Sequence, residues 1–98
     1  MLSQFAGPRV NVRPMACEHI RKAGDPPAKT PKGCEECLKT GSKWVQLRRC
    51  LSCGHIGCCD SSPKKHATGH YQTTRHPVIQ TFQPGESWKW CYLDEVQA

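Results

Sequence analysis

The chain reads CLSCGHIGCCDSSPKKHATGHYQTTRH between Cys50 and His76. The two-residue spacing of Cys50-x-x-Cys53 lets both sulfurs reach one metal ion. Gly54 follows at once and suits the positive φ that such a tight turn needs. Upstream, WVQLRR at residues 44–49 begins with strand-forming residues. We therefore predict a strand that runs into a two-cysteine metal knuckle.

The second half of this stretch predicts a helix from about Pro63 to Gln72. Serine can cap a helix and proline is tolerated at its first position, so Ser61-Ser62-Pro63 marks the start. His66 and His70 are four residues apart, which places both side chains on one face of the helix. Both can then point into a metal-bearing interior.

A second pair with the same spacing, Cys34-x-x-Cys37, lies upstream. Each pair supplies half of a tetrahedral zinc site and needs two more ligands. Four further donors are available, so the count closes at two complete sites. These donors are Cys58, His66, His70 and His76.

Three more donors remain near the two ends of the sequence: Cys17 and His19 in a C-x-H motif, and Cys91. Asp94, three residues after Cys91, is placed to be the fourth ligand. A carboxylate oxygen can bind zinc, although sulfur and nitrogen dominate structural sites, and a water could take this position instead. The sequence thus predicts three zinc ions, and two at minimum.

The composition is consistent with a domain held together by metal. The chain has 98 residues and 37% hydrophobic residues with cysteine included, which is little for a self-sufficient core. Residues 1–16 contain no apolar run typical of a signal peptide, and no segment has the length of a membrane span. We expect a cytoplasmic, reducing setting, in which thiols bind zinc rather than form disulfides.

The remaining segments complete the expected fold. Residues 77–82 and 88–93 are predicted strands joined by a turn at residues 83–86, and residues 21–33 are expected to form an irregular loop. We predict a monomeric α+β domain over residues 15–98, with a short antiparallel sheet and one main helix. Residues 1–14 are expected to be a disordered extension.

This series of residues resembles the UBP-type zinc finger, found in ubiquitin-specific proteases and in a ubiquitin-binding histone deacetylase. The resemblance covers Cys17 to about Val96, and its ending is similar to that of stand-alone bacterial proteins with this finger. It rests on C-x-H at Cys17, the two C-x-x-C pairs, Cys58 five residues after Cys53, H-x-x-x-H at His66, His76-Pro77, and Trp90-Cys91-Tyr92.

The resemblance also implies how the ligands are grouped. Asp94 falls on a family cysteine position. His55 is expected to be an ordinary strand residue, and Cys59 to face away from the metal, because neighbours on an extended chain point to opposite sides. The implied zinc sites are Cys34, Cys37, Cys58 and His66; Cys50, Cys53, His70 and His76; and Cys17, His19, Cys91 and Asp94. The first two interleave along the chain and so cross-brace the domain.

In ubiquitin-binding members, an aromatic pocket takes the free C-terminal diglycine of ubiquitin, and an arginine after the last zinc cysteine holds its carboxylate. Trp44, Trp90 and Tyr92 fall at the pocket aromatics, although core packing would explain them equally well. Asp60 stands where the arginine would be, and it repels a carboxylate. We therefore expect a module that binds a peptide or protein, with weak binding of ubiquitin's tail; a carboxylate between aromatic walls suits an amine or a lysine.

Nucleic-acid binding and catalysis have less support from the sequence. The formal charge of +6, with Lys64-Lys65, Arg48-Arg49 and Arg75, is compatible with nucleic-acid binding, but these residues are scattered along the sequence. Catalysis would need Cys59 as a nucleophile or an open zinc position at Asp94. With four of the five histidines assigned to zinc, only His55 is left as a base, so we expect no enzyme activity.

Overall fold

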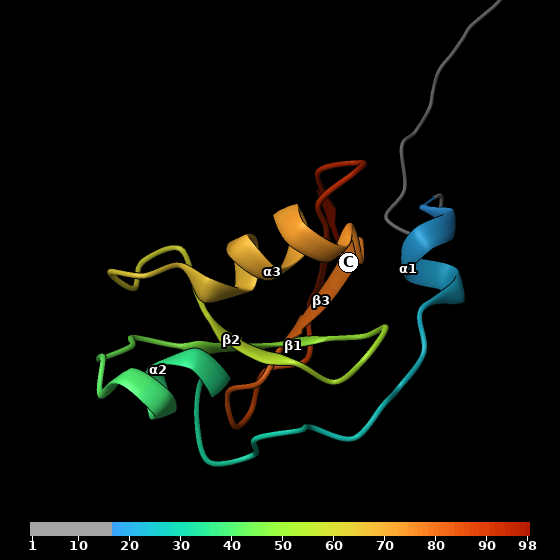
Figure 1. Ribbon diagram of the computed structural model, residues 1–98. Helices are drawn as coiled ribbons and strands as arrows, with labels where there is room; N and C mark the ends of the chain where they lie inside the picture. Colours follow the sequence, from blue (N-terminus) through green and yellow to red (C-terminus); the bar gives the residue numbers. More distant parts are fainter. Residues whose placement is uncertain (1–16) are drawn as a thin grey trace, which may run out of the picture.

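The computed structural model describes residues 17–98, and the predicted extension at residues 1–14 lies outside the described residues. The elements form one antiparallel sheet of five strands, in the order β2-β1-β3-β4-β5, with three helices around it (Figure 1). This confirms the predicted α+β class with its short sheet and one main helix. The elements are α1 (Glu18–Lys22), α2 (Glu35–Thr40), β1 (Leu47–Cys50), β2 (Ile56–Cys58), α3 (His66–Thr74), β3 (Val78–Thr81), β4 (Lys89–Cys91) and β5 (Val96–Gln97).

Several boundaries differ from those predicted. The main helix begins at His66 rather than Pro63, since Lys65 before it has φ of 51° and no side chain caps the helix. Ser62 is buried, and its hydroxyl instead accepts a hydrogen bond of 2.8 Å from the backbone N–H of Val45. His55 was expected on a strand, but β2 starts one residue later. The elements α1, α2 and β5 were not predicted.

The hydrophobic core is small and rich in cysteine. Within residues 17–98, seven of the fourteen buried apolar residues are cysteines. The larger aliphatic residues form two groups around them: Ile20, Leu51 and Val78 lie with Cys17 and Cys91, and Leu47 and Ile56 lie with Cys34, Cys37 and Cys58. Cysteine buries little apolar surface, so hydrophobic burial alone gives this domain modest stability.

Gly54 has the positive φ that the knuckle requires, 84°. A Cβ built on it would lie 2.1 Å from the carbonyl oxygen of Pro27, whereas one on Gly41, with φ of 72°, would meet nothing within 4 Å. We expect Gly54→Ala to destabilise the domain by at least about 3 kcal/mol, because overpacking adds to the strain of the positive φ. Gly41→Ala should cost only about 1 kcal/mol. Thermal unfolding of the two variants checks this, and equal losses would contradict it.

Within residues 17–98, no helix is long and apolar enough to cross a bilayer.

Candidate metal centres and ligand pocket

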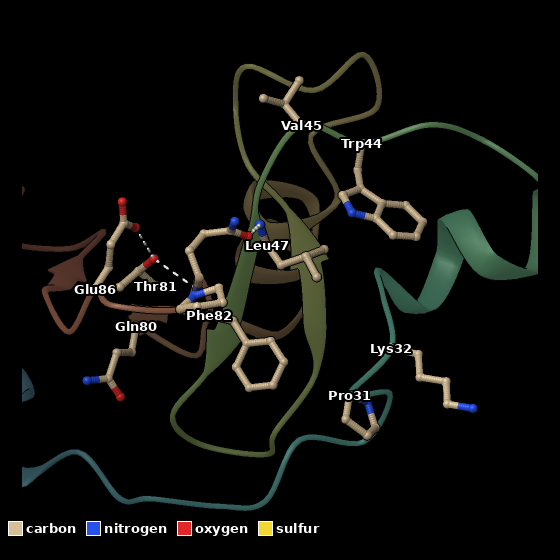
Figure 2. Close-up of a pocket in the computed structure, with 11 residues that line it drawn as sticks. Pro31, Lys32, Trp44, Val45, Leu47, Gln80, Thr81, Phe82 and Glu86 are labelled. Atoms are coloured by element: carbon tan, nitrogen blue, oxygen red, sulfur yellow. Dashed lines mark hydrogen bonds between the residues drawn. The ribbon is translucent and has the colours of Figure 1, made fainter.

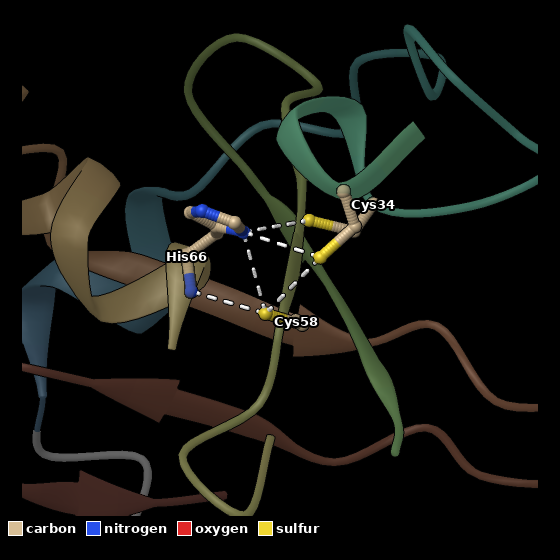
Figure 3. Close-up of side chains that lie close together, drawn as sticks. Cys34, Cys58 and His66 are labelled. Carbon is tan, nitrogen blue, oxygen red and sulfur yellow. Dashed lines mark hydrogen bonds between the residues drawn. The ribbon is translucent and has the colours of Figure 1, made fainter. Parts of the chain in front are cut away.

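The first cluster consists of Cys34, Cys37, Cys58 and His66. Cys34 precedes α2 and Cys37 lies on it, while Cys58 ends β2 and His66 opens α3. Figure 3 shows the imidazole of His66 directed at the sulfurs of Cys34 and Cys58. Its Nδ1 lies 3.3 Å, 3.4 Å and 3.6 Å from the sulfurs of Cys34, Cys37 and Cys58. This cluster joins α2, the sheet and α3.

The second cluster consists of Cys50, Cys53, His70 and His76. Cys50 ends β1 and Cys53 lies in the knuckle that follows, while His70 is on α3 and His76 comes just before β3. The sulfur of Cys50 is 3.5 Å from Nδ1 of His76, and that of Cys53 is 3.4 Å from Nε2 of His70. Helix α3 thus contributes one histidine to each of two neighbouring clusters.

The third cluster joins the start of the described chain to its end. Cys17 and His19 come from α1 and the residue before it, and Cys91 and Asp94 from β4 and the turn after it. Oδ2 of Asp94 lies 3.0 Å from the sulfur of Cys17 and 3.1 Å from Nδ1 of His19. The sulfur of Cys91 is 3.6 Å from the same nitrogen. The carboxylate of Asp94 thus stands where a fourth ligand would.

These separations fit tetrahedral zinc. With zinc bonds of about 2.3 Å to sulfur and about 2.05 Å to nitrogen, a tetrahedron has S···N edges of about 3.5 Å and S···S edges of about 3.8 Å. The S···N distances given above run from 3.3 to 3.6 Å, and the sulfurs of Cys37 and Cys58 are 4.0 Å apart. In each cluster the four ligand atoms lie within 4.8 Å of one another.

Protonation and hydrogen bonds also suit metal binding. Burial is the main cause that raises the pKa of Cys17 to about 11 and of Cys37 to about 12, so these thiols stay protonated at neutral pH until a bound metal ion displaces the proton. Burial, together with His55 and His76, lowers the pKa of His70 to about 4, which keeps it in the neutral form that binds metal. Backbone N–H groups of Ser52, His66 and Asp94 point at the sulfurs of Cys50, Cys58 and Cys91, at 3.4, 3.2 and 3.4 Å, and would stabilise thiolates.

His55 lies outside the clusters but links two of them. Its ring stacks on that of His70, with centroids 4.0 Å apart and planes 2° from parallel. Its Nε2 is 2.9 Å from each carboxylate oxygen of Glu36, which sits between Cys34 and Cys37. His55 is thus held by Glu36 on α2, the helix that carries a donor of the first cluster. Its ring in turn orients His70, a donor of the second cluster. Sequence reasoning missed this, because no local pattern shows which ring a histidine will stack on.

The sheet register builds a pocket on one face. Side chains two residues apart on a strand share a face, so Trp88, Trp90 and Tyr92 stand together along β4 and its flanks. Trp90 pairs with Ile79 on β3, and Arg48 on β1 pairs with Thr81, which is two residues from Ile79. Asp60 closes the pocket from the loop after β2, giving a volume of about 240 Å³.

Three of the four residues predicted to bind a ligand thus line one pocket: Asp60, Trp90 and Tyr92. Trp44 does not, since it lies in a separate depression with Leu47 and Phe82 (Figure 2). There it packs on the group of Cys34, Cys37, Leu47, Ile56 and Cys58, and its ring covers Gly33. Trp44 is part of the core around the first cluster. Arg48 and Trp88 line the pocket but were not predicted to do so.

Three four-residue clusters of cysteine, histidine and aspartate on a small α+β scaffold define a multi-zinc domain. The family described as "Zn-finger in ubiquitin-hydrolases and other protein" matches residues 34–98, and the chain belongs to this UBP-type zinc-finger family. The family binds zinc, and the three clusters can hold the ions. The resemblance stated from the motifs is confirmed.

Relatives and a solved structure agree with this assignment. Ubiquitin carboxyl-terminal hydrolase 44 of Ailuropoda melanoleuca is 35% identical over 82 residues, which is 79% of this chain and 10% of the relative. Ubiquitin carboxyl-terminal hydrolase 16 of Mus musculus is 34% identical over 77 residues, 78% of this chain and 8% of the relative. The chain thus spans about a tenth of these enzymes. The solution structure of protein RPA1320 from Rhodopseudomonas palustris is 53% identical with a TM-score of 0.76, over 83% of this chain and 78% of that one.

Proposed function

We propose that this protein is a non-catalytic zinc module that binds a peptide group of a partner protein in the pocket of Asp60, Trp90 and Tyr92. Its folded unit would span residues 15–98, act as a monomer and work in a reducing compartment such as the cytoplasm. The zinc ligands would be the four residues of each cluster: Cys34, Cys37, Cys58 and His66; Cys50, Cys53, His70 and His76; and Cys17, His19, Cys91 and Asp94.

The donor counts support a structural role for the zinc ions. A catalytic zinc keeps a position open for water, whereas each cluster here offers four protein donors, which fill a tetrahedral site. The remaining thiol, Cys59, is buried, and the only side chain within residues 17–98 that hydrogen-bonds to its sulfur is Ser62, through its hydroxyl at 3.6 Å. His55 is paired with Glu36. No described base therefore stands beside the free thiol to activate it.

The observation that carries the binding proposal is the pocket itself. Trp88, Trp90 and Tyr92 are only partly buried, so their aromatic faces remain available to a ligand. The carboxylate of Asp60 lines the same pocket. Aromatic faces beside a carboxylate can bind a positively charged group on a flexible chain. Ubiquitin's C-terminal tail should bind weakly, because Asp60 stands where the resemblance places the arginine that holds the tail's carboxylate.

Nucleic-acid binding has less support. Arg49 pairs with Asp25 at 2.8 Å, and the guanidinium of Arg75 lies 4.9 Å from the ring centroid of Tyr71. Arg48 faces the pocket. The basic residues of the strand β1 and of the loop after α3 are thus held by intramolecular contacts rather than arranged as one stripe for phosphates.

The three tryptophans provide the test, because each gives its own indole N–H signal in a two-dimensional NMR spectrum. A positional-scanning hexapeptide library and ubiquitin would be titrated into the zinc-loaded protein. We expect binding peptides to shift the signals of Trp88 and Trp90 and to leave that of Trp44 unchanged, since Trp44 lies in the separate depression. Failure of every peptide pool to shift Trp88 and Trp90 would refute the proposal.

A further inference from the structure

Arg48 gives the ligand pocket a positive charge that has no ionic partner among residues 17–98. One guanidinium nitrogen donates to the carbonyl oxygen of Leu47 at 3.0 Å, and the other donates to Oε1 of Gln46 at 3.0 Å. Its guanidinium carbon lies 4.5 Å from the ring centroid of Trp88. These contacts fix the guanidinium in place, and both acceptors are neutral. They use only some of its five N–H groups, so part of its donor capacity is left for a ligand.

Asp60 gives the same pocket a negative charge, held by other neighbours. Its Oδ1 accepts a hydrogen bond of 2.6 Å from the hydroxyl of Thr68, which is 3.2 Å from the hydroxyl of Tyr92. Arg48, Asp60 and Tyr92 all line this pocket, so one ligand can lie within reach of both charges.

Arg48 and Asp60 do not pair with each other, although they line the same pocket. No ion pair of 4.0 Å or less joins them within the described part of the chain. A purely cationic ligand would be attracted by Asp60 and repelled by Arg48. A purely anionic ligand would be attracted by Arg48 and repelled by Asp60. A ligand that carries both charges, suitably spaced, satisfies both.

We propose that the pocket binds the C-terminal lysine of a peptide, and this rests on the proposed peptide-binding function. The chain-end carboxylate would lie on Arg48, the side-chain ammonium on Asp60, and the methylene stem along Trp90 and Tyr92. The pocket's volume of about 240 Å³ suits one long side chain rather than a folded segment.

The test uses four short peptides that share the sequence acetyl-Ser-Gly-Ser before their last residue. The last residue is lysine with a free carboxylate, lysine amide, norleucine with a free carboxylate, or norleucine amide. We expect the first to bind most tightly and each single-charge analogue to bind about 10- to 100-fold more weakly, as expected for the loss of one charge-assisted hydrogen bond. Affinities come from the indole shifts of Trp88 and Trp90.

Variants assign each charge to its residue. Asp60→Asn should abolish the preference for lysine over norleucine and keep that for carboxylate over amide, and Arg48→Gln should do the opposite. Glu95→Gln and Lys64→Gln are matched controls, because both residues are exposed and lie outside this pocket. Arg48→Lys keeps the charge and should retain at least part of the preference for carboxylate, which guards against a folding defect in Arg48→Gln.

The outcomes separate this inference from the proposed function. Equal affinity of the four peptides, with shifts at Trp88 and Trp90, would overturn the dipolar ligand and leave the peptide pocket standing. Tighter binding of a peptide with one charge alone would overturn it too. Absence of any shift at Trp88 and Trp90, both with these peptides and with the hexapeptide library, would overturn both proposals.

Discussion

Removal of zinc by a strong chelator will unfold the domain at room temperature. Metal binding in small zinc domains is coupled to folding, and one structural zinc supplies about 10–16 kcal/mol at pH 7, against a total stability of about 5–15 kcal/mol for a typical protein. Here half of the buried apolar residues are cysteines, so little core remains without the metal. Circular dichroism and the dispersion of NMR signals, recorded under reducing conditions, measure the loss.

Two controls accompany the chelation experiment. Adding zinc back should restore the native spectrum, whereas magnesium should not, because thiolates and imidazoles are poor magnesium ligands. Binding releases protons from thiols such as Cys17 and Cys37, whose pKa values are raised by burial, so the domain's affinity for zinc should fall as the pH falls. A domain that keeps its dispersed spectrum without zinc would contradict the structural role of the metal.

Cys58→Ala will abolish the first zinc site and unfold the domain, while Cys59→Ala will do neither. Cys58 is fully buried, and its sulfur lies 3.6 Å from Nδ1 of His66 and 4.0 Å from the sulfur of Cys37. At Cys59, the next residue, Ser62 is the only side chain within residues 17–98 that hydrogen-bonds to the sulfur, so the loss of this thiol should cost about 1 kcal/mol. Zinc content and thermal unfolding of the two variants measure the difference.

This pair of variants is well matched, since the two cysteines are adjacent, both are buried and the substitution is the same. If Cys59→Ala lost zinc and Cys58→Ala kept it, the assignment of ligands in the first cluster would be wrong. Equal loss in both variants would show that burial, rather than ligation, determines the effect.

The cysteine pairs could be anticipated because metal ligands leave a local signature, whereas their grouping with the other donors followed from the family resemblance. Two cysteines that bind one ion from a tight turn are typically two to four residues apart, and Gly54 after the second pair has the positive φ that favours glycine. The strands at β1, β3 and β4 were predicted for a similar reason, since β-branched and aromatic residues mark them. The predictions that were wrong concern features that depend on distant contacts. Ser62 was predicted as part of the helix start, but its hydroxyl accepts a hydrogen bond from the backbone N–H of Val45.

The pocket was harder to predict, because its members come together through strand register. In the sequence Arg48 is one of many scattered basic residues, and only its pairing with Thr81 places it on the face of Trp90. Trp44 was expected in the pocket, but it lies before β1 begins and packs on the core around the first cluster. The sequence supplies an aromatic and charged composition, whereas the sheet determines which side chains share a face.

Native mass spectrometry of the reduced, zinc-loaded protein will show whether twelve residues hold three zinc ions in four-ligand sites. We expect the mass of the chain with three zinc ions. We also expect only one thiol, that of Cys59, to be alkylated without protection by zinc once mild denaturant opens the chain. Two zinc ions, with Cys17 and Cys91 also left unprotected, would contradict the third site and the role of Asp94 in it.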